Sequence, residues 1–190
     1  LLYIKKNEYK KAMVHFKRSE DTLDQNLRQK INIQFGICHK ELGDFKKAIV
    51  SFTLASENDS NESLQISAKE NLADTYLRRR SNQSDLELAG NLYDTLIKQN
   101  PNHSNNIDWR KKKSEILRLQ KRDDEAIATL SKILKEDLSN WEEAQIEIGN
   151  ILMSASPQRF KVAAAHYKAI IDTVSSKEKN NELILNYAIC

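Results

Sequence analysis

The feature that most constrains this chain is a pair of amphipathic helices that the sequence predicts between Gln29 and Glu62. Apolar residues at three- and four-residue spacing mark one face of each helix. The predicted face of the first helix is formed by Ile31, Phe35, Cys38 and Leu42, and that of the second by Phe45, Ala48, Ile49, Phe52 and Ala55. Because an isolated helical pair cannot bury both of its faces, this segment requires neighbours like itself.

Leu42, Gly43 and Asp44 predict a tight turn between the two helices. Gly43 can adopt the left-handed backbone conformation that ends a helix. Asp44 can then cap the next helix by accepting a hydrogen bond from its first turn.

The segment resembles the tetratricopeptide repeat family, whose unit is a helical pair of about 34 residues. The residues that carry the resemblance are Gly36, Leu42, Gly43, Phe45, Ala48, Phe52 and Ala55. It implies that Gly36 and Ala48 let the helices approach closely and that Phe52 fills the space between them. The sequence departs from the family at Ser60, where proline is usual, and at Asn32, where tryptophan is frequent. The implied fold is all-α, a right-handed α-α superhelical solenoid of antiparallel helix pairs.

The same packing set recurs along the chain, and we predict a single tetratricopeptide-like solenoid over residues 1–190. Its repeats are predicted at about 1–26 (partial), 29–62, 66–103, 107–140, 142–177 and 180–190 (partial). In the first, Tyr3, Tyr9, Ala12, Phe16 and Ser19 take the equivalent places. The last leaves Leu183, Tyr187 and Ala188 unmatched, so we expect a fragment of a longer solenoid.

The sequence of the third repeat predicts that the turn between its two helices differs from that of the other repeats. Aligning Tyr76 with Ala89 requires an insertion near residues 80–84, so a longer loop is expected between the two helices. Pro101 follows Asn100, where the second helix of this repeat should stop.

The fourth repeat is more divergent and the fifth recovers the pattern. In the fourth, Asp123 or Asp124 is expected to cap the second helix, and Lys113 and Ser114 replace an apolar residue and glycine, which predicts looser packing. The residues expected to face one another there are Trp109, Ile116, Leu117, Ala126, Leu130 and Ile133. In the fifth, the expected set is Ile148, Gly149, Leu152, Phe160, Ala163, Tyr167 and Ile170, with Ser156 and Pro157 opening the second helix.

The family resemblance implies that the first helices of the repeats line a concave groove. Ile33 and Ile37 lie about 200° around their helix from the core stripe, at about 100° per residue, and can point into this groove. We predict that a partner binds there to Ile33, Ile37, Asp74, Arg78, Lys111, Glu115, Arg118, Asn150 and Met153. The alternative is that Ile33, Ile37 and Ile146 pack between successive first helices.

The expected partner is one or more proteins that offer a peptide or helix with apolar anchors and charged residues, acidic ones included, between them. Some family members clamp a C-terminal carboxylate with lysine, asparagine and arginine side chains. Here Ile33 and Ile37 occupy the first clamp positions, and Glu70 and Asp74 the next, where they would repel a carboxylate. Binding of chaperone tails in that manner is not expected.

Two basic runs, 78–80 and 110–113, lie at the ends of predicted first helices. They fit either an anionic partner or a solvated face balanced by Glu70, Asp74, Asp108 and Glu115. No aromatic side chains interleave with these runs to stack on bases, and the net charge is only +3, so nucleic acid is not favoured.

No motif in the chain indicates catalysis. The four histidines show no HxxxH or HExxH spacing, and Cys38 and Cys190 show no CxxC spacing, so we predict no metal, no cofactor and no enzymatic activity. The composition suits a helical soluble protein, and no apolar run approaches the roughly 20 residues that would insert into a membrane. The compartment is not fixed by the sequence, with a lean to the cytoplasm.

The sequence therefore predicts a non-catalytic protein–protein interaction scaffold that binds a segment of its partner in the concave groove. One alternative is an architectural segment of a larger complex that self-associates through the ends of the solenoid. Another is the recognition arm of a multidomain protein whose chemistry lies elsewhere.

Overall fold

The computed structural model describes residues 11, 14, 24–134, 137–155, 159–171, 173 and 177–189. Across these residues the regular structure is helical and no strand is found. The helices are α3 (Gln25–Glu41), α4 (Phe45–Glu57), α5 (Glu62–Arg79), α6 (Gln83–Gln99), α7 (Asn106–Leu119), α8 (Asp123–Leu130), α9 (Leu138–Ala155), α10 (Phe160–Ile171) and α11 (Lys177–Ile189).

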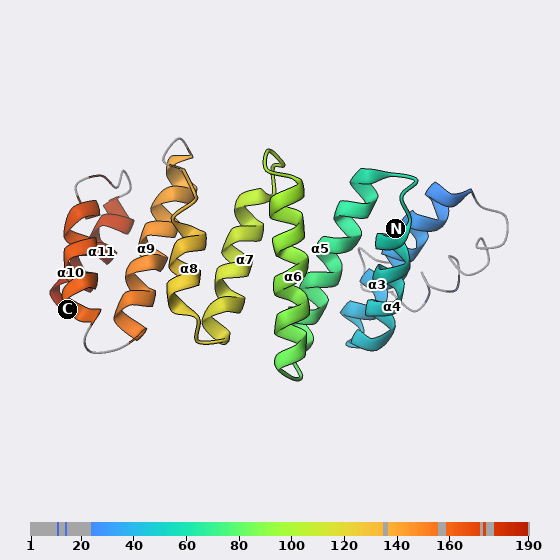
Figure 1. The fold of residues 1–190 in the computed structure, drawn as a ribbon, viewed down its shortest axis with the longest axis horizontal. Helices are drawn as coiled ribbons and strands as arrows, with labels where there is room; N and C mark the ends of the chain where they lie inside the picture. The colour runs from blue at the N-terminus through green and yellow to red at the C-terminus, as the bar shows by residue number, and fades with distance from the viewer. Residues whose placement is uncertain are drawn as a thin grey trace. The chain divides into compact units, whose positions relative to one another are not determined.

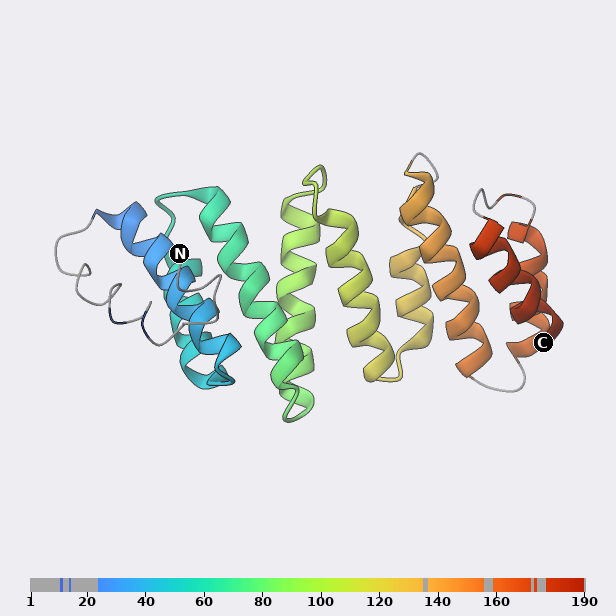
Figure 2. The same cartoon turned by 180° about the vertical axis from the view of Figure 1, so that it is seen from behind.

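The chain divides into two compact units, which we call unit 1 (Leu1–Pro101) and unit 2 (Asn102–Cys190). Within each unit, consecutive helices run in opposite directions and pack as neighbours (Figure 1; seen from behind in Figure 2). The first helices of successive pairs also contact each other, α3 with α5 and α7 with α9. The prediction of an all-α fold of antiparallel helix pairs is confirmed, while the single right-handed solenoid stays a prediction.

The α3/α4 pair forms as the sequence predicts. Phe52 and Ala48 are fully buried, and a Cβ atom at Gly36 would lie 2.5 Å from the Phe52 ring, so only glycine fits there. Gly43 ends α3 with φ of +77°, and Asp44 Oδ1 accepts a hydrogen bond from the Lys47 N–H at 3.3 Å. Leu42, in contrast, is 43% exposed, because the buried stripe of α3 ends at Cys38.

The predicted long loop in the third repeat is wrong. Only residues 80–82 join α5 to α6, and the additional residues lengthen the helices instead. Asn82 caps α6 by accepting a hydrogen bond from the Asp85 N–H at 3.0 Å, which draws residues 83 and 84 into the helix. As predicted, α6 ends just before Asn100 and Pro101.

The α5–α6 turn is held by a buried carboxylate. Asp85 is 1% exposed and accepts hydrogen bonds from the Arg79 guanidinium and from the Ser81 N–H and hydroxyl, the last two at 2.9 Å. Hydrogen bonding to Arg79 lowers the pKa of Asp85 to about 2.

In unit 2, the residues predicted to face one another are buried: Trp109, Ile116 and Leu117 in α7, Ala126 and Leu130 in α8, and Ile133 just after α8. The predicted aspartate cap is wrong, because Arg122 holds the N-cap position of α8 without a side-chain hydrogen bond. The turn is closed by the backbone instead. Lys121 has φ of +59°, and the Arg122 N–H donates to the Leu117 carbonyl at 2.8 Å.

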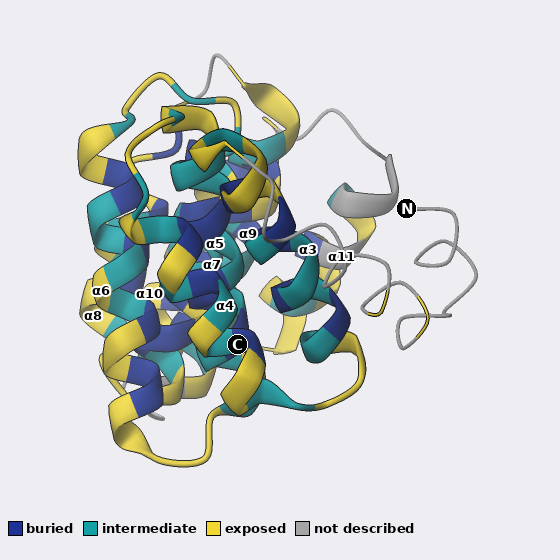
Figure 3. Cartoon of the chain, turned by 90° about the vertical axis from the view of Figure 1, so that its right-hand side faces the viewer, coloured by how far each residue is buried: buried dark blue, intermediate teal, exposed yellow. Residues whose placement is uncertain are grey.

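The α9/α10 pair repeats the packing of α3/α4, with Tyr167 fully buried where a Cβ atom at Gly149 would overlap its ring. Leu183 of α11 belongs to the same core cluster. Along the helices, buried residues form stripes and exposed residues cover the opposite sides (Figure 3). Ser156 and Pro157 lie outside the described residues, and so do the residues predicted for the first partial repeat: Tyr3, Tyr9, Ala12, Phe16 and Ser19.

Candidate partner-binding site

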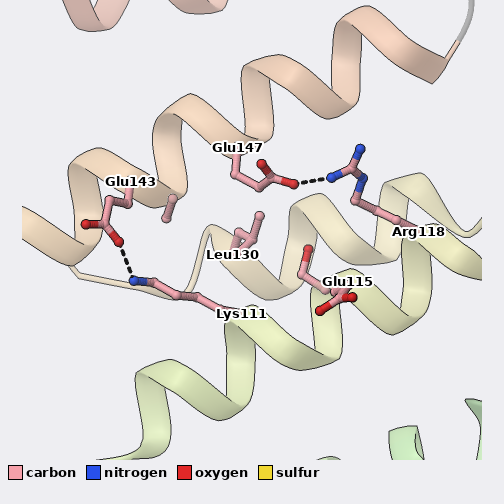
Figure 4. Close-up of a pocket in the computed structure, with 8 residues that line it drawn as sticks. Lys111, Glu115, Arg118, Leu130, Glu143 and Glu147 are labelled. Carbon is pink, nitrogen blue, oxygen red and sulfur yellow. Dashed lines mark hydrogen bonds and ion pairs between the residues drawn. The ribbon is translucent and has the colours of Figure 1, made fainter. Parts of the chain in front are cut away.

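An open pocket lies between the first helices of the two successive pairs in unit 2. Four side chains on one face of α7 form one wall, and three on α9 form the other (Figure 4). We call this the α7/α9 pocket; it has a volume of about 390 Å³ and is lined by Lys111, Ser114, Glu115, Arg118, Leu130, Glu143, Ala144 and Glu147. The α7 residues recur at spacings of three and four, which places them on a single helical face.

The rim of the α7/α9 pocket carries two ion pairs that bridge the helices. Lys111 Nζ lies 2.7 Å from Glu143 Oε2, and Arg118 pairs with Glu147 (Figure 4). Both pairs are partly exposed, so each contributes at most about 1 kcal/mol to stability. Since Lys111 and Arg118 are already paired, the remaining charge on the lining is the exposed carboxylate of Glu115.

The inner wall of the pocket is polar at one point and apolar at another. Ser114 is 1% exposed, and among the described residues its hydroxyl has no hydrogen-bond partner. Leu130 and Ala144, each 1% exposed, supply buried apolar surface. A second hollow of about 680 Å³ shares Glu115 and Arg118 with the first, so the crevice continues along α7.

In unit 1 the corresponding residues are packed. Ile33 is 5% exposed and belongs to a core cluster with Phe52 and Leu72, and Ile37 lies half-buried against that cluster. Ile146 of unit 2 is likewise buried, at 8% exposure. Ile33 and Ile146 therefore pack between helices, which is the alternative to exposure in the groove.

Two further predicted contact residues act as hydrogen-bond acceptors for the core. Tyr93, fully buried on α6, donates its hydroxyl to Asp74 on α5. Tyr167 on α10 donates to Asn150 on α9 at 2.9 Å. Asp74 and Asn150 are half-buried, and each accepts a hydrogen bond from a buried tyrosine hydroxyl.

The structure thus brings Lys111, Glu115 and Arg118 together at one pocket and places the other predicted residues elsewhere. Met153 packs against the core of unit 2, and Arg78 pairs with Glu41 at 3.0 Å.

Sequence reasoning missed the acidic wall formed by Glu143 and Glu147. A usable signal was present, because these residues lie four positions apart on α9 and about one repeat after Lys111 and Arg118.

The basic runs are largely occupied by contacts within the chain. Arg79 pairs with Asp85, and Arg78 with Glu41. Arg110 Nε donates to Asn106 Oδ1 at 3.0 Å, and burial lowers the pKa of Arg110. These contacts agree with the interpretation of the runs as part of a charge-balanced surface.

The structure also bears on metal binding and on membrane insertion. Among the residues it describes, no group of three or more histidine, cysteine, aspartate or glutamate side chains could hold a metal ion. No helix in the described part of the chain is long and apolar enough to cross a membrane. Cys38 is fully buried, and burial raises the pKa of its thiol.

Antiparallel helix pairs closed by a glycine against an aromatic ring define this chain as a helical-repeat protein with the tetratricopeptide-like fold. No protein-family model and no curated protein matches the sequence. Two crystal structures of TPR-like repeats, from a Podosopora anserina protein named as a kinesin light chain, are similar to it.

The first of these two structures, a single-residue variant, has a TM-score of 0.68 and 11% identity over 93% of this chain and 91% of its own. The second has a TM-score of 0.59 and 12% identity over 98% of this chain and 89% of its own. At such identity the likeness shows the fold alone.

Proposed function

We propose that this chain is a non-catalytic protein-interaction scaffold whose first helices bind a peptide or helical segment of a partner protein. The observation that carries the proposal is the α7/α9 pocket, open between two helices that are fixed by a packed core. Its volume of about 390 Å³ falls within the range of about 300–1,000 Å³ typical of ligand pockets.

The lining of the pocket suits a segment that carries both an apolar anchor and charges. Leu130 and Ala144, each 1% exposed, are the apolar residues of the lining and form the floor on which the anchor lies. Lys111 and Arg118 can exchange their glutamate partners for acidic residues of the incoming segment, because partly exposed ion pairs cost little to rearrange. Glu115 favours a hydrogen-bond donor or a basic group in the segment.

The remaining predicted contact residues lie on the first helices of the two units, and each unit is proposed to offer its own part of the contact surface. Ile37 and Arg78 are partly accessible in unit 1, as are Asn150 and Met153 in unit 2. Ile33 and Asp74 contribute to it through the packing and hydrogen bonding that hold α3 and α5 in place.

The proposal is tested by selecting peptides that bind the purified chain from a displayed library of random 12-residue sequences. Affinities of the selected peptides are then measured against a Lys111→Glu, Arg118→Glu double variant. The matched control is Lys46→Glu, Lys98→Glu, which makes the same charge change at exposed positions of unit 1. Circular dichroism verifies that both variants keep their helices.

We expect the pocket variant to weaken binding at least tenfold and the control to leave it unchanged, because only the former reverses charge at the rim. Equal affinities in both variants would place the binding surface away from the α7/α9 pocket and contradict the proposal.

The architectural alternative is favoured by one observation on α11. This helix exposes four large apolar side chains: Ile184 (48%), Leu185 (60%), Tyr187 (40%) and Ile189 (61%). If the chain self-associates there, its mass in light scattering will rise with concentration, and Leu185→Glu will abolish the rise. A mass that is constant over concentration would exclude this alternative.

A further inference from the structure

In the α7/α8 pair, the second helix has leucine at the position where the other described pairs have an aromatic ring. In α3/α4 and α9/α10, the rings of Phe52 and Tyr167 lie against Gly36 and Gly149. Tyr93 holds the same position on α6. In α7/α8 the two equivalent positions are Leu130 and Ser114, and both line the α7/α9 pocket.

A hydrogen-bond acceptor for a tyrosine hydroxyl is nevertheless present in this pair. In α5/α6 and α9/α10, the acceptors are Asp74 and Asn150, each directly after the small residue that faces the ring. The equivalent residue of α7 is Glu115, directly after Ser114. Glu115 lines the pocket, and its own pair supplies no phenol to donate to it.

The wall of the pocket also contains a polar group that lacks a partner. Ser114 is 99% buried (1% exposed), and no group in the described part of the chain hydrogen-bonds its hydroxyl. An unpartnered buried hydroxyl is destabilising, and a polar atom brought in by a ligand relieves the cost.

Arg118 holds the position from which a lysine lies over a ring in the α3/α4 pair. In α3/α4, Lys40 Nζ lies 5.6 Å from the centroid of the Phe52 ring and also donates to Asn71 on α5, at 2.9 Å. Arg118 is the equivalent of Lys40, and it pairs with Glu147 on α9 as Lys40 does with Asn71. A ring bound above Leu130 would therefore meet the Arg118 guanidinium.

We propose that the α7/α9 pocket binds the side chain of a tyrosine from the partner segment, an inference that rests on the proposed function. The ring packs on Leu130 and Ala144, and the phenol O–H donates to the Glu115 carboxylate. The bound residue restores in trans the arrangement that Tyr93 and Tyr167 make within their own pairs.

The lining favours tyrosine over related side chains. Phenylalanine fits the apolar floor but offers no O–H to Glu115. Phosphotyrosine has lost the phenol O–H and would place its negative charges against the Glu115 carboxylate.

The test uses the library-selected peptides, resynthesised with tyrosine, phenylalanine, leucine or phosphotyrosine at the anchoring position, and measures Kd by fluorescence anisotropy. We expect phenylalanine to weaken binding about tenfold, which is the cost of losing one hydrogen bond to a charged acceptor. Leucine and phosphotyrosine should weaken it further.

Two protein variants identify the group that recognises the phenol. Glu115→Ile, which copies Ile37 beside Phe52, should erase the preference for tyrosine over phenylalanine, while Glu87→Ile, at an exposed position of α6, should preserve it. In a second variant, Ser114→Gly with Leu130→Tyr supplies the ring within the chain and should weaken tyrosine peptides at least tenfold. If that variant does not fold, the comparison of Glu115→Ile with Glu87→Ile still decides whether Glu115 recognises the phenol.

Each outcome separates the inference from the function on which it rests. In one outcome, the peptides depend on Lys111 and Arg118 but bind equally well with tyrosine, phenylalanine and leucine. That result overturns the tyrosine inference and supports the proposed scaffold function. A library that yields no peptide dependent on the pocket overturns both.

Discussion

The crevice between α3 and α5 in unit 1 is filled, whereas the crevice between α7 and α9 in unit 2 is open. In unit 1, Ile33, Ile37 and Phe52 pack together in one core cluster. The equivalent residues of unit 2 are Lys111, Glu115 and Leu130, and they line the α7/α9 pocket. The same two-helix framework therefore serves packing in one unit and offers an accessible surface in the other.

The difference depends on side chains rather than on a change in the framework. The cross-helix contact of Lys40 with Asn71 recurs as that of Arg118 with Glu147, so the registers of the two crevices correspond. What changes is that two isoleucines become charged residues and a ring becomes a leucine. Charged side chains extend toward water instead of filling the crevice, and the space between the first helices remains open.

The largest expected effect comes from placing alanine at two equivalent positions, Gly36 and Ser114. Gly36→Ala should destabilise unit 1 by about 3 kcal/mol, because its Cβ would lie 2.5 Å from the buried Phe52 ring. Ser114→Ala should leave unit 2 unchanged or stabilise it by up to about 1 kcal/mol, because it removes a buried hydroxyl that has no partner.

Hydrogen exchange measured by mass spectrometry reports each unit separately, so it can check both variants of this pair. Protection should fall in α3 and α4 for Gly36→Ala and persist in α7 and α8 for Ser114→Ala. Equal losses in both would show that Ser114 is packed as tightly as Gly36, which contradicts the open crevice.

The second effect is acid sensitivity of unit 1. The pKa of Asp85 is about 2 in the folded protein, below its ordinary value of 3.8, so the carboxylate stabilises the fold above about pH 4. This contribution, about 2 kcal/mol at about 1.4 kcal/mol per pKa unit, is lost as the pH falls through 2. The corresponding turn of unit 2 has an exposed pair, Arg122 with Glu125, and should lose far less.

Exchange at pH 6 and at pH 2.5 tests this difference, with rates corrected for the intrinsic effect of pH. Protection around the α5–α6 turn should drop at the lower pH in the natural sequence. The variant Asp85→Asn should already be weak at pH 6 and change little. A drop of equal size at the α7–α8 turn would refute the assignment to Asp85.

The third effect comes from exchanging the residues that distinguish the two crevices. Ile37→Glu should destabilise unit 1 by about 1 kcal/mol, because it places a carboxylate against the apolar cluster around Phe52. Glu115→Ile should leave the stability of unit 2 within about 0.5 kcal/mol, because Glu115 is exposed. Thermal denaturation of both variants checks the pair, and a larger loss for Glu115→Ile would mean that Glu115 supports the fold.

Most of the fold was predictable from sequence because its determinants are local. Helical periodicity identified the buried faces, and Gly36 with Phe52 identified the close approach of α3 and α4. The turns were harder. The loop at residues 80–84 and the aspartate cap of α8 were wrong, since an insertion can lengthen a helix and a backbone turn can replace a cap.

The burial of the polar residue Gln29 could not be predicted from the sequence either. Gln29 is fully buried because its side-chain amide donates to the carbonyls of Ala55 and Asn58, at 2.9 and 2.7 Å, where α4 ends. Such a contact depends on which backbone groups of another helix need a donor, and periodicity carries no information about that.

The candidate site was predictable only as a helical face. Spacing placed Lys111, Glu115 and Arg118 together on α7, and the structure agrees. It could not show that Asp74 and Asn150 accept hydrogen bonds from buried tyrosines, because periodicity states which residues share a face and not what lies opposite.

The smallest expected effect concerns the ion pair of Arg118 with Glu147, whose side chains are 37% and 38% exposed. Arg118→Gln should cost unit 2 less than about 0.5 kcal/mol, because water screens the pair and both side chains regain rotamer freedom. The equivalent change in unit 1, Lys40→Gln, should cost more, because Lys40 also lies over the buried Phe52 ring. Urea denaturation in low and in high salt measures both. A cost for Arg118→Gln that exceeds that for Lys40→Gln would mean that this ion pair closes the crevice of unit 2 against entry, the opposite of an accessible binding surface.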